Sequence, residues 1–193
     1  MALSLQEKYT IEELIAGCKK GKRTFQKGMY DQFSAKFFAI CLRYGKDYAE
    51  AEDMLQEGFI KLFNKMDKYN NVGSFGAWAS RLISNNCIDI IRKRPNLYTI
   101  SDDYALDQKS PAPSALDNMI GEDLLLLVQS LPTGYRTIFN MYAIEGYSHK
   151  EIATRLEISE GTSKSQLNRA RKLLQKKLIE LENQENNLTQ LEK

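Results

Sequence analysis

Two short helical patterns follow one another closely in residues 146–178, GYSHKEIATRLEISEGTSKSQLNRARKLLQKKL. Ser148 can cap the first helix with its hydroxyl, and Glu151, three residues later, completes a capping box. Apolar residues at helical spacing end at Leu156, and Ser159 can cap the second helix. Two short helices joined by a tight turn indicate a helix-turn-helix, so we expect this stretch to bind DNA.

The second helix of this stretch has one apolar face and one basic face. Leu167, Ala170, Leu174 and Leu178 form the apolar face, and no acidic residue occurs between positions 164 and 177. The outward basic residues are Lys164, Arg169, Arg171, Lys172, Lys176 and Lys177. A solvated amphipathic helix is the commoner explanation for an isolated basic helix, but the capped helix before it favours a major-groove reader. The residues expected near base edges are Lys164, Ser165, Gln166, Asn168 and Arg169.

The turn between these helices departs from the usual pattern at one position. Glu157 stands where helix-turn-helix turns often have glycine. If its backbone is left-handed, the side chain costs about 1 kcal/mol, which we expect the domain to tolerate.

The composition allows one medium domain or two small ones, because the chain has 193 residues of which 42% are apolar. The formal net charge is only +2, so nucleic-acid binding requires an uneven distribution of charge. The middle of the chain is acidic, since residues 95–130 carry Lys109 alone against Asp102, Asp103, Asp107, Asp117, Glu122 and Asp123.

Three widely spaced cysteines without a CxxC pair suit reduced core thiols in a cytoplasm: Cys18, Cys41 and Cys87. The first residues lack a basic segment followed by a long apolar run, and no stretch is long enough to span a bilayer. We therefore expect a cytoplasmic protein that does not insert into membranes.

The sequence lacks the parts of a recognisable enzyme site. His149 is the only histidine, and we expect it to face solvent. There is no Gly-rich phosphate loop and no Cys/His set with metal-ligand spacing. Hydrolase, kinase and zinc-site interpretations are therefore weak, and no catalytic residue, metal or cofactor is predicted.

Apolar residues at helical spacing predict four helices in the first half of the chain, and an all-α fold overall. One helix is capped by Thr10 and ends near Gly21, a second begins at about 23, a third spans about 48–66, and a fourth runs from 74 to Pro95. The second is expected to pack centrally through Phe25, Met29, Tyr30, Phe33, Phe37, Phe38, Ile40 and Cys41.

The third predicted helix carries polar residues opposite its apolar stripe, which contains Leu55, Phe59, Leu62, Phe63 and Met66. The outward residues are Glu52, Asp53, Gln56 and Glu57. They form either a solvated face or a charged docking surface. Catalysis is less probable than either, because water keeps the proton affinities of exposed carboxylates ordinary.

The fourth predicted helix combines core residues with hydrogen-bond donors, and Trp78 is interpreted as core rather than as a stacking platform. The donors are Arg81, Asn85, Asn86, Arg92, Lys93 and Arg94. Aromatic residues close to cations suit unstacked, single-stranded nucleic acid.

Polar and proline-containing residues from 96 to 115 predict a flexible acidic linker between two small helical domains, 1–95 and 116–180. The second domain is expected to begin with a helix over about 116–130, followed by another from Leu131-Pro132 that ends by Gly146. Residues 181–193 form a polar tail that continues the last helix.

The chain resembles the extracytoplasmic-function (ECF) branch of the sigma-70 family in three segments. They are AEDMLQEGFIKLF, FGAWASRLISNNCIDIIRK and LPTGYRTIFNMYAIEGYSHKEIATRLEISEGTSKSQLNRARKLL. The resemblance covers roughly residues 20–178 and implies sigma region 2 in the first domain and sigma region 4 in the second. It implies a bacterial initiation factor, not an enzyme, that joins core RNA polymerase, recognises promoters and helps to open the DNA.

The resemblance also implies roles for particular residues. Asp53, Gln56 and Glu57 are implied to dock on the beta-prime clamp helices of the polymerase. The resemblance implies that the 68–75 loop forms a pocket for a flipped base. The residues implied to contact the minus-ten element and its displaced strand are Lys68, Phe75, Arg81, Asn85, Asn86, Asp89, Arg92 and Lys93. Minus-thirty-five duplex contacts fall to Lys164, Ser165, Gln166, Asn168 and Arg169, with phosphates held by Arg171 and Lys172. Further implied partners are the polymerase's beta flap and, as a candidate regulator, an anti-sigma factor, while the linker is expected in the RNA exit path.

The main alternative is a stand-alone helix-turn-helix regulator that binds operator DNA and uses its first domain for dimerisation or effector sensing. It explains the end of the chain only. It gives no account of Asp53, Gln56 and Glu57 followed by the 78–92 helix.

Overall fold

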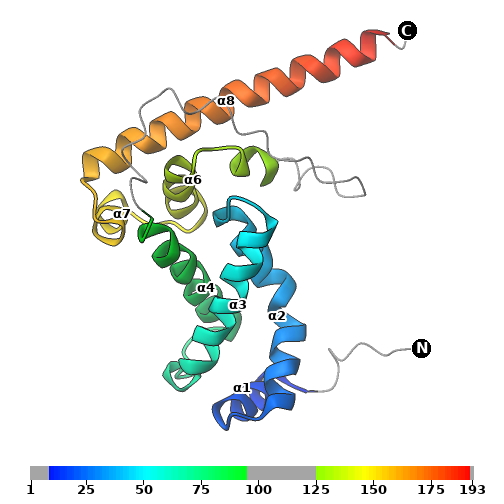
Figure 1. Cartoon of the computed structure of the whole chain (residues 1–193), viewed down its shortest axis with the longest axis vertical. Helices are drawn as coiled ribbons and strands as arrows, with labels where there is room; N and C mark the ends of the chain where they lie inside the picture. The colour runs from blue at the N-terminus through cyan, green and yellow to red at the C-terminus, as the bar shows by residue number, and fades with distance from the viewer. Residues whose placement is uncertain (1–8, 95–124, 192–193) are drawn as a thin grey trace. The chain divides into compact units, whose positions relative to one another are not determined.

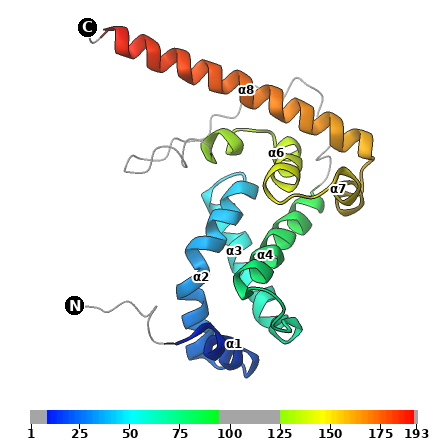
Figure 2. The same cartoon turned by 180° about the vertical axis from the view of Figure 1, so that it is seen from behind.

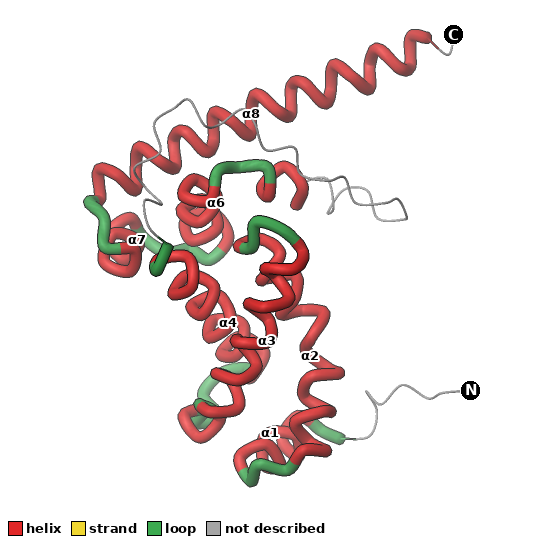
Figure 3. Tube along the Cα trace, viewed as in Figure 1, coloured by secondary structure: helices red, strands yellow, loops and turns green. Residues whose placement is uncertain are grey.

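The computed structural model describes residues 9–94 and 125–191, and these contain helices and loops but no strand (Figures 1 and 3). The predicted all-α class is therefore confirmed. The chain divides into two compact units, Met1–Lys93 and Arg94–Lys193. The predicted linker, and residues 116–124 of the helix expected after it, lie outside the described residues.

Unit 1 contains α1 (Ile11–Lys19), α2 (Arg23–Tyr44), α3 (Tyr48–Asn64), the 3₁₀ helix η2 (Met66–Lys68) and α4 (Phe75–Arg92). Thr10 and Glu13 form the expected capping box on α1. Ser74 caps α4 by accepting a hydrogen bond from the amide of Ala77. Asp47 caps α3 in the same way, which the sequence interpretation did not identify. These caps define where the chain enters each helix.

The core of unit 1 lies among α2, α3 and α4, which pack against one another and lie side by side in both views (Figures 1 and 2). Its largest fully buried side chains include Tyr44, Phe37, Met29, Met54, Leu62, Met66, Ile83, Ile88 and Ile91. The three cysteines are buried, as predicted. The expectation for Tyr30 was wrong: its side chain is 43% exposed, because it lies over Phe59 at the edge of the core.

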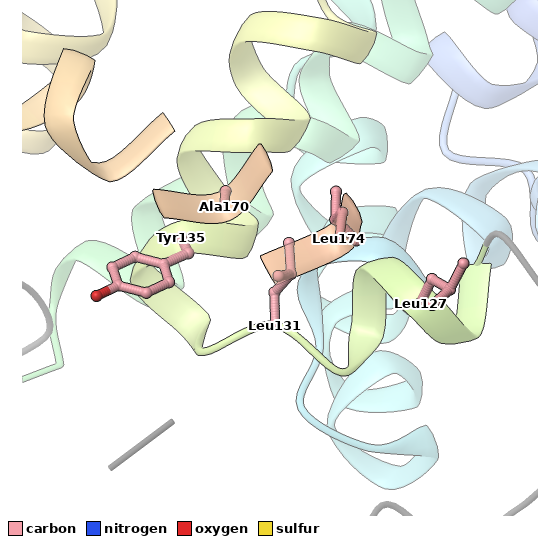
Figure 4. Packing of buried hydrophobic residues seen from close by; sticks show 5 residues of the cluster. All are labelled: Leu127, Leu131, Tyr135, Ala170 and Leu174. Carbon is pink, nitrogen blue, oxygen red and sulfur yellow. The ribbon is translucent and has the colours of Figure 1, made fainter. Parts of the chain in front are cut away.

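Unit 2 contains a short helix at 125–129, α6 (Thr133–Phe139), the π-helix η4 (Asn140–Ile144), α7 (His149–Leu156) and α8 (Glu160–Leu191). Part of its core joins the first of these segments to α8, and Figure 4 shows the side chains packed together. They are Leu127, Leu131, Tyr135, Ala170 and Leu174.

The helix-turn-helix of unit 2 forms as predicted. Ser148 and Glu151 make the capping box of α7, and the Ser159 hydroxyl accepts a hydrogen bond from the amide of Thr162 at 2.9 Å. Glu157 is left-handed with a φ of 57°, and the amide of Ile158 donates to the carbonyl of Ala153. This reversal lets α8 start in a new direction without glycine.

The apolar face of α8 ends earlier than predicted. Leu167, Ala170 and Leu174 are buried, but Leu178 is 44% exposed. Leu178 lies one turn beyond Leu174, where the described core cluster of unit 2 ends. The predicted continuation of the last helix into the tail is observed, since α8 extends to Leu191.

Replacement of Glu157 by glycine should raise the free energy of unfolding of unit 2 by about 1 kcal/mol, because glycine adopts a positive φ without steric cost. Urea unfolding followed by circular dichroism measures the change. Glu157→Ala is the matched control, since it removes the carboxylate but keeps the Cβ atom. Equal stabilities of the glycine and alanine variants would show that this turn stores no strain.

Candidate functional site

A pocket of about 250 Å³ lies on unit 1 between the end of α3 and one face of α4. The pocket is lined by one face of α4, on which Trp78, Leu82, Asn85 and Asp89 follow one another at intervals of three or four residues. Arg81 belongs to the same face, since it lies three residues after Trp78 and four before Asn85. The remaining lining residues are Lys61, Lys65, Lys68 and Asn86. Five of the eight predicted minus-ten residues are thereby brought together: Lys68, Arg81, Asn85, Asn86 and Asp89.

The pocket is electropositive. Four of its lining residues are cations, Lys61, Lys65, Lys68 and Arg81, against one acid, Asp89. A carboxylate oxygen of Asp89 also lies 3.9 Å from the guanidinium of Arg92, just outside the pocket. An excess of lysine and arginine in a concave site favours a ligand that carries phosphate.

An aromatic cluster of Tyr69, Phe75 and Trp78 stands next to the pocket, with ring centroids 5.2 to 5.7 Å apart. The Tyr69 hydroxyl donates to the carbonyl of Gly73 at 2.8 Å, which closes the loop before α4. Trp78, interpreted from sequence as core, is only half-buried and lines the pocket. Phe75, expected among the minus-ten contacts, is instead buried against Tyr69 and Phe33, so its ring is not available on the surface.

Asn86 was expected to offer donors on an outer face, and this was also wrong. Its side chain is only 2% exposed. The Asn86 amide donates to the carbonyl of Met54 at 3.3 Å, and its oxygen accepts a hydrogen bond from the Lys61 ammonium. Asn86 therefore joins α4 to α3 beneath the pocket and orients Lys61.

The acidic surface of α3 is organised as predicted, with one difference. Asp53 and Gln56 are exposed, whereas Glu57 is half-buried. A carboxylate oxygen of Glu57 lies 2.8 Å from the Lys61 ammonium. Lys61 thus belongs both to the α3 surface and to the pocket. Arg92 and Lys93, at the end of α4, are exposed outside the pocket.

On unit 2, six of the seven predicted minus-thirty-five residues are exposed at the start of α8: Lys164, Ser165, Asn168, Arg169, Arg171 and Lys172. The guanidinium of Arg171 lies 5.6 Å from the centroid of the Tyr142 ring. Gln166 is the exception, since its side chain is 5% exposed and its oxygen has no hydrogen-bond partner among the described residues. The expectation that Gln166 reads base edges was wrong because it lies on the inner side of α8, beside Leu167.

His149 does not simply face solvent as expected. Its Nδ1 lies 2.9 Å from the hydroxyl oxygen of the buried Ser163, and its ring stacks on Tyr142 with centroids 4.6 Å apart. Burial, together with the positive charge of Lys164, lowers the pKa of His149. His149 therefore ties α7 to α8, a role that spacing in the sequence did not reveal.

Within residues 9–94 and 125–191 no group of histidine, cysteine or acidic residues is arranged to hold a metal ion. No described helix combines the length and apolar character needed to cross a membrane.

Comparison with known proteins gives matches to both units. The family described as Sigma-70 region 2 matches residues 29–95, and that described as Sigma-70, region 4 matches residues 121–174. The ECF RNA polymerase sigma factor SigM of Bacillus subtilis is 31% identical over 148 residues, which span 76% of this chain and 90% of SigM. SigW of the same organism is 29% identical over 189 residues, which span 89% of this chain and 98% of SigW.

Other matches cover a smaller share of the matched protein or have a lower sequence identity. The ECF RNA polymerase sigma factor SigE of Mycolicibacterium smegmatis is 30% identical over 74% of this chain, but the match spans only 57% of SigE. Among solved structures, the sigma factor RpoE of Bartonella quintana, in complex with the anti-sigma factor NepR, matches with 22% identity and a TM-score of 0.48. That match covers 79% of this chain and 95% of RpoE.

Replacement of Asn86 by alanine should destabilise unit 1 by about 1 to 3 kcal/mol, because the buried Met54 carbonyl loses its donor and the Lys61 ammonium loses its acceptor. Thermal unfolding measures the change. Asn85→Ala is the control, since Asn85 lines the pocket one position earlier but is not fully buried. If Asn86→Ala unfolds at the same temperature as the wild-type protein, Asn86 is not the structural link between α3 and α4.

Proposed function

Because this chain belongs to the ECF RNA polymerase sigma factors of the sigma-70 family, we propose that its two units divide promoter recognition between them. As a sigma factor it binds core RNA polymerase and promoter DNA to initiate transcription. In our proposal unit 1 docks on the polymerase and holds unpaired minus-ten bases, while unit 2 binds the minus-thirty-five duplex. The stand-alone regulator is not favoured, because the region 2 family matches most of unit 1.

The pocket between α3 and α4 is the observation that carries the minus-ten proposal. Four cations around it attract the phosphates of a displaced strand, and Trp78 offers an aromatic surface to an unstacked base. The Asn85 amide can donate and accept hydrogen bonds, while the Asp89 carboxylate accepts them. A concave site with these groups suits one flipped base and its neighbouring phosphates better than it suits paired DNA.

The acidic surface of α3 supports docking on core polymerase. Asp53 and Gln56 are exposed on a helix whose opposite side is buried in the core. A rigid acidic surface attracts a basic partner and increases the rate of encounter. The family resemblance identifies that partner as the beta-prime clamp helices. Glu57 contributes less to this attraction in our proposal, because Lys61 already neutralises much of its charge.

The start of α8 supports recognition of the minus-thirty-five duplex. Lys164, Asn168 and Arg169 are exposed there and carry groups that pair with base edges in the major groove. Arg171 and Lys172 follow on the next turn, where they can neutralise phosphates. Phosphate contacts of this kind make affinity fall steeply as salt concentration rises.

Promoter opening requires no catalytic step by this chain in our proposal. Unstacking and extruding a base costs a few kcal/mol, which the contacts in the unit 1 pocket can offset. The polymerase supplies the chemistry of RNA synthesis, and this chain acts only as a binding factor. In our proposal it therefore acts in the cytoplasm, where core polymerase transcribes. An anti-sigma factor that covers the α3 surface and the start of α8 together would block both recognition steps.

Replacement of Asn85 by alanine should reduce open-complex formation by roughly tenfold, because a hydrogen bond to the captured base is lost. Permanganate reactivity of unpaired thymines measures opening, and co-elution with core polymerase measures docking. Docking should be unchanged. Equal loss of opening and docking would contradict the assignment of Asn85 to the unpaired strand.

Replacement of Arg169 by alanine should cost about 1 to 3 kcal/mol of discrimination at one minus-thirty-five base pair. Footprinting of holoenzyme on matched and single-substituted promoters measures this preference. Lys172→Ala is the matched control, since loss of a phosphate contact should weaken all promoters alike and reduce the salt dependence. An unchanged preference in Arg169→Ala would remove this residue from the reading surface.

A further inference from the structure

His149, the only histidine of the chain, is held on one edge and one face of its ring. Its Nδ1 lies 2.9 Å from the hydroxyl oxygen of Ser163, which is buried near the start of α8. The ring of Tyr142 stacks on it with centroids 4.6 Å apart. Nε2, on another edge of the ring, makes no hydrogen bond with any residue that the structure describes. His149 is half-buried, so this fixed ring keeps one polar atom for a ligand.

The neighbours of His149 on α8 are two cations to which we assign DNA contacts. Lys164 directly follows Ser163, and Arg171 lies seven residues further, close to two helical turns, so both stand on one exposed face. Tyr142 links the histidine ring to this face, because the Arg171 guanidinium lies 5.6 Å from the centroid of the same tyrosine ring. Both cations act on the charge of His149. A phosphate drawn to this face is therefore brought beside the histidine.

Charged and titratable groups surround His149 on every element packed against it. They are Glu160, Lys164 and Arg171 on α8, the Tyr142 phenol on η4, and Lys150 and Glu151 on its own helix. Burial lowers the pKa of His149, Lys164 and Arg171 lower it further, and Glu160 acts in the opposite direction. The imidazole is therefore neutral near pH 7 when no DNA is bound.

A phosphate beside this ring reverses the balance. It neutralises the charge of the two cations and favours the charged form of a group that it contacts, so it raises the pKa of His149. Protonation costs no internal hydrogen bond, because the Ser163 hydroxyl can donate to Nδ1 or accept from it. In the protonated ring Nε2 also carries a hydrogen, which a phosphate oxygen accepts in a charge-assisted hydrogen bond.

We propose that His149 binds a backbone phosphate of the minus-thirty-five duplex in its protonated form, so that unit 2 takes up one proton from solvent as it binds DNA. This inference rests on the proposed duplex binding by α8 and deepens it. A phosphate contact carries no base information. Affinity for all promoters should therefore rise together as pH falls, while discrimination between bases stays with the exposed residues at the start of α8.

The first test measures binding of the full-length chain to a duplex of arbitrary sequence at low salt, by fluorescence anisotropy. Wild-type affinity should rise by about fivefold from about pH 8 to about pH 6, where histidine titrates and ordinary carboxylates do not. His149→Gln should lose this rise, because glutamine forms hydrogen bonds but does not titrate. Lys150→Gln is the matched control: it removes an exposed charge one residue away, keeps the histidine and should keep the rise.

The second test needs no substitution. Because the chain has one histidine, isotope labelling of histidine gives one set of ring signals, and their chemical shifts follow protonation in nuclear magnetic resonance spectra. The midpoint of this titration should move to higher pH when duplex is added. A midpoint that stays in place or moves to lower pH overturns the proposal. This measurement also decides the matter if circular dichroism shows that His149→Gln does not fold.

The outcomes separate the phosphate contact from the duplex binding on which it rests. If His149→Gln keeps the full rise, the proton is taken up elsewhere, such as at the N-terminal amine, and the proposal is overturned. Lys172→Ala tests the premise, since loss of its phosphate contact should weaken binding at every pH. If Lys172→Ala and Arg169→Ala both bind like the wild-type protein, duplex binding by α8 fails. If they are weakened but His149→Gln keeps the rise, only the histidine contact fails.

Discussion

The packing of α4 against α3 determines what unit 1 can present to its partners. Buried Asn86 bonds to the Met54 carbonyl and to Lys61, and Lys61 in turn pairs with Glu57. One network therefore connects the acidic surface of α3 with the cationic pocket. The buried Asn86 bond favours one arrangement of α3 and α4, because misplacement leaves the Asn86 amide and the Met54 carbonyl without partners. In our proposal unit 1 holds polymerase and an extruded base at the same time, and a fixed arrangement of α3 and α4 suits both tasks.

The near-neutral charge of the chain is compatible with nucleic-acid binding because its charges are segregated. Cations gather around the α3–α4 pocket and at the start of α8, while Asp53 lies exposed on α3. Local fields of opposite sign act over about 8 to 10 Å at physiological salt, so each surface attracts its own partner. The acidic α3 surface also disfavours DNA there, which leaves it available for a protein.

Local patterns in the sequence predicted the helices well, and long-range contacts explain where residue predictions failed. Thr10, Ser148 and Ser159 cap helices as expected, because capping depends only on residues a few positions apart. In contrast, the burial of Asn86 depends on Met54, and that of Phe75 on Phe33 of another helix. The predictions that Gln166 and His149 are exposed failed for the same reason. Helical periodicity predicts which face of a helix a residue lies on, but not which neighbouring element covers that face.

Two units with separate cores on one chain change how weak contacts combine. Once one unit has bound, the linked unit samples the DNA at a high effective concentration, so neither surface needs high affinity alone. In our proposal, selectivity then comes from promoters that satisfy both units at a compatible spacing. Binding surfaces of moderate affinity are also an advantage for an initiation factor, because contacts that are too strong would oppose release once RNA synthesis begins.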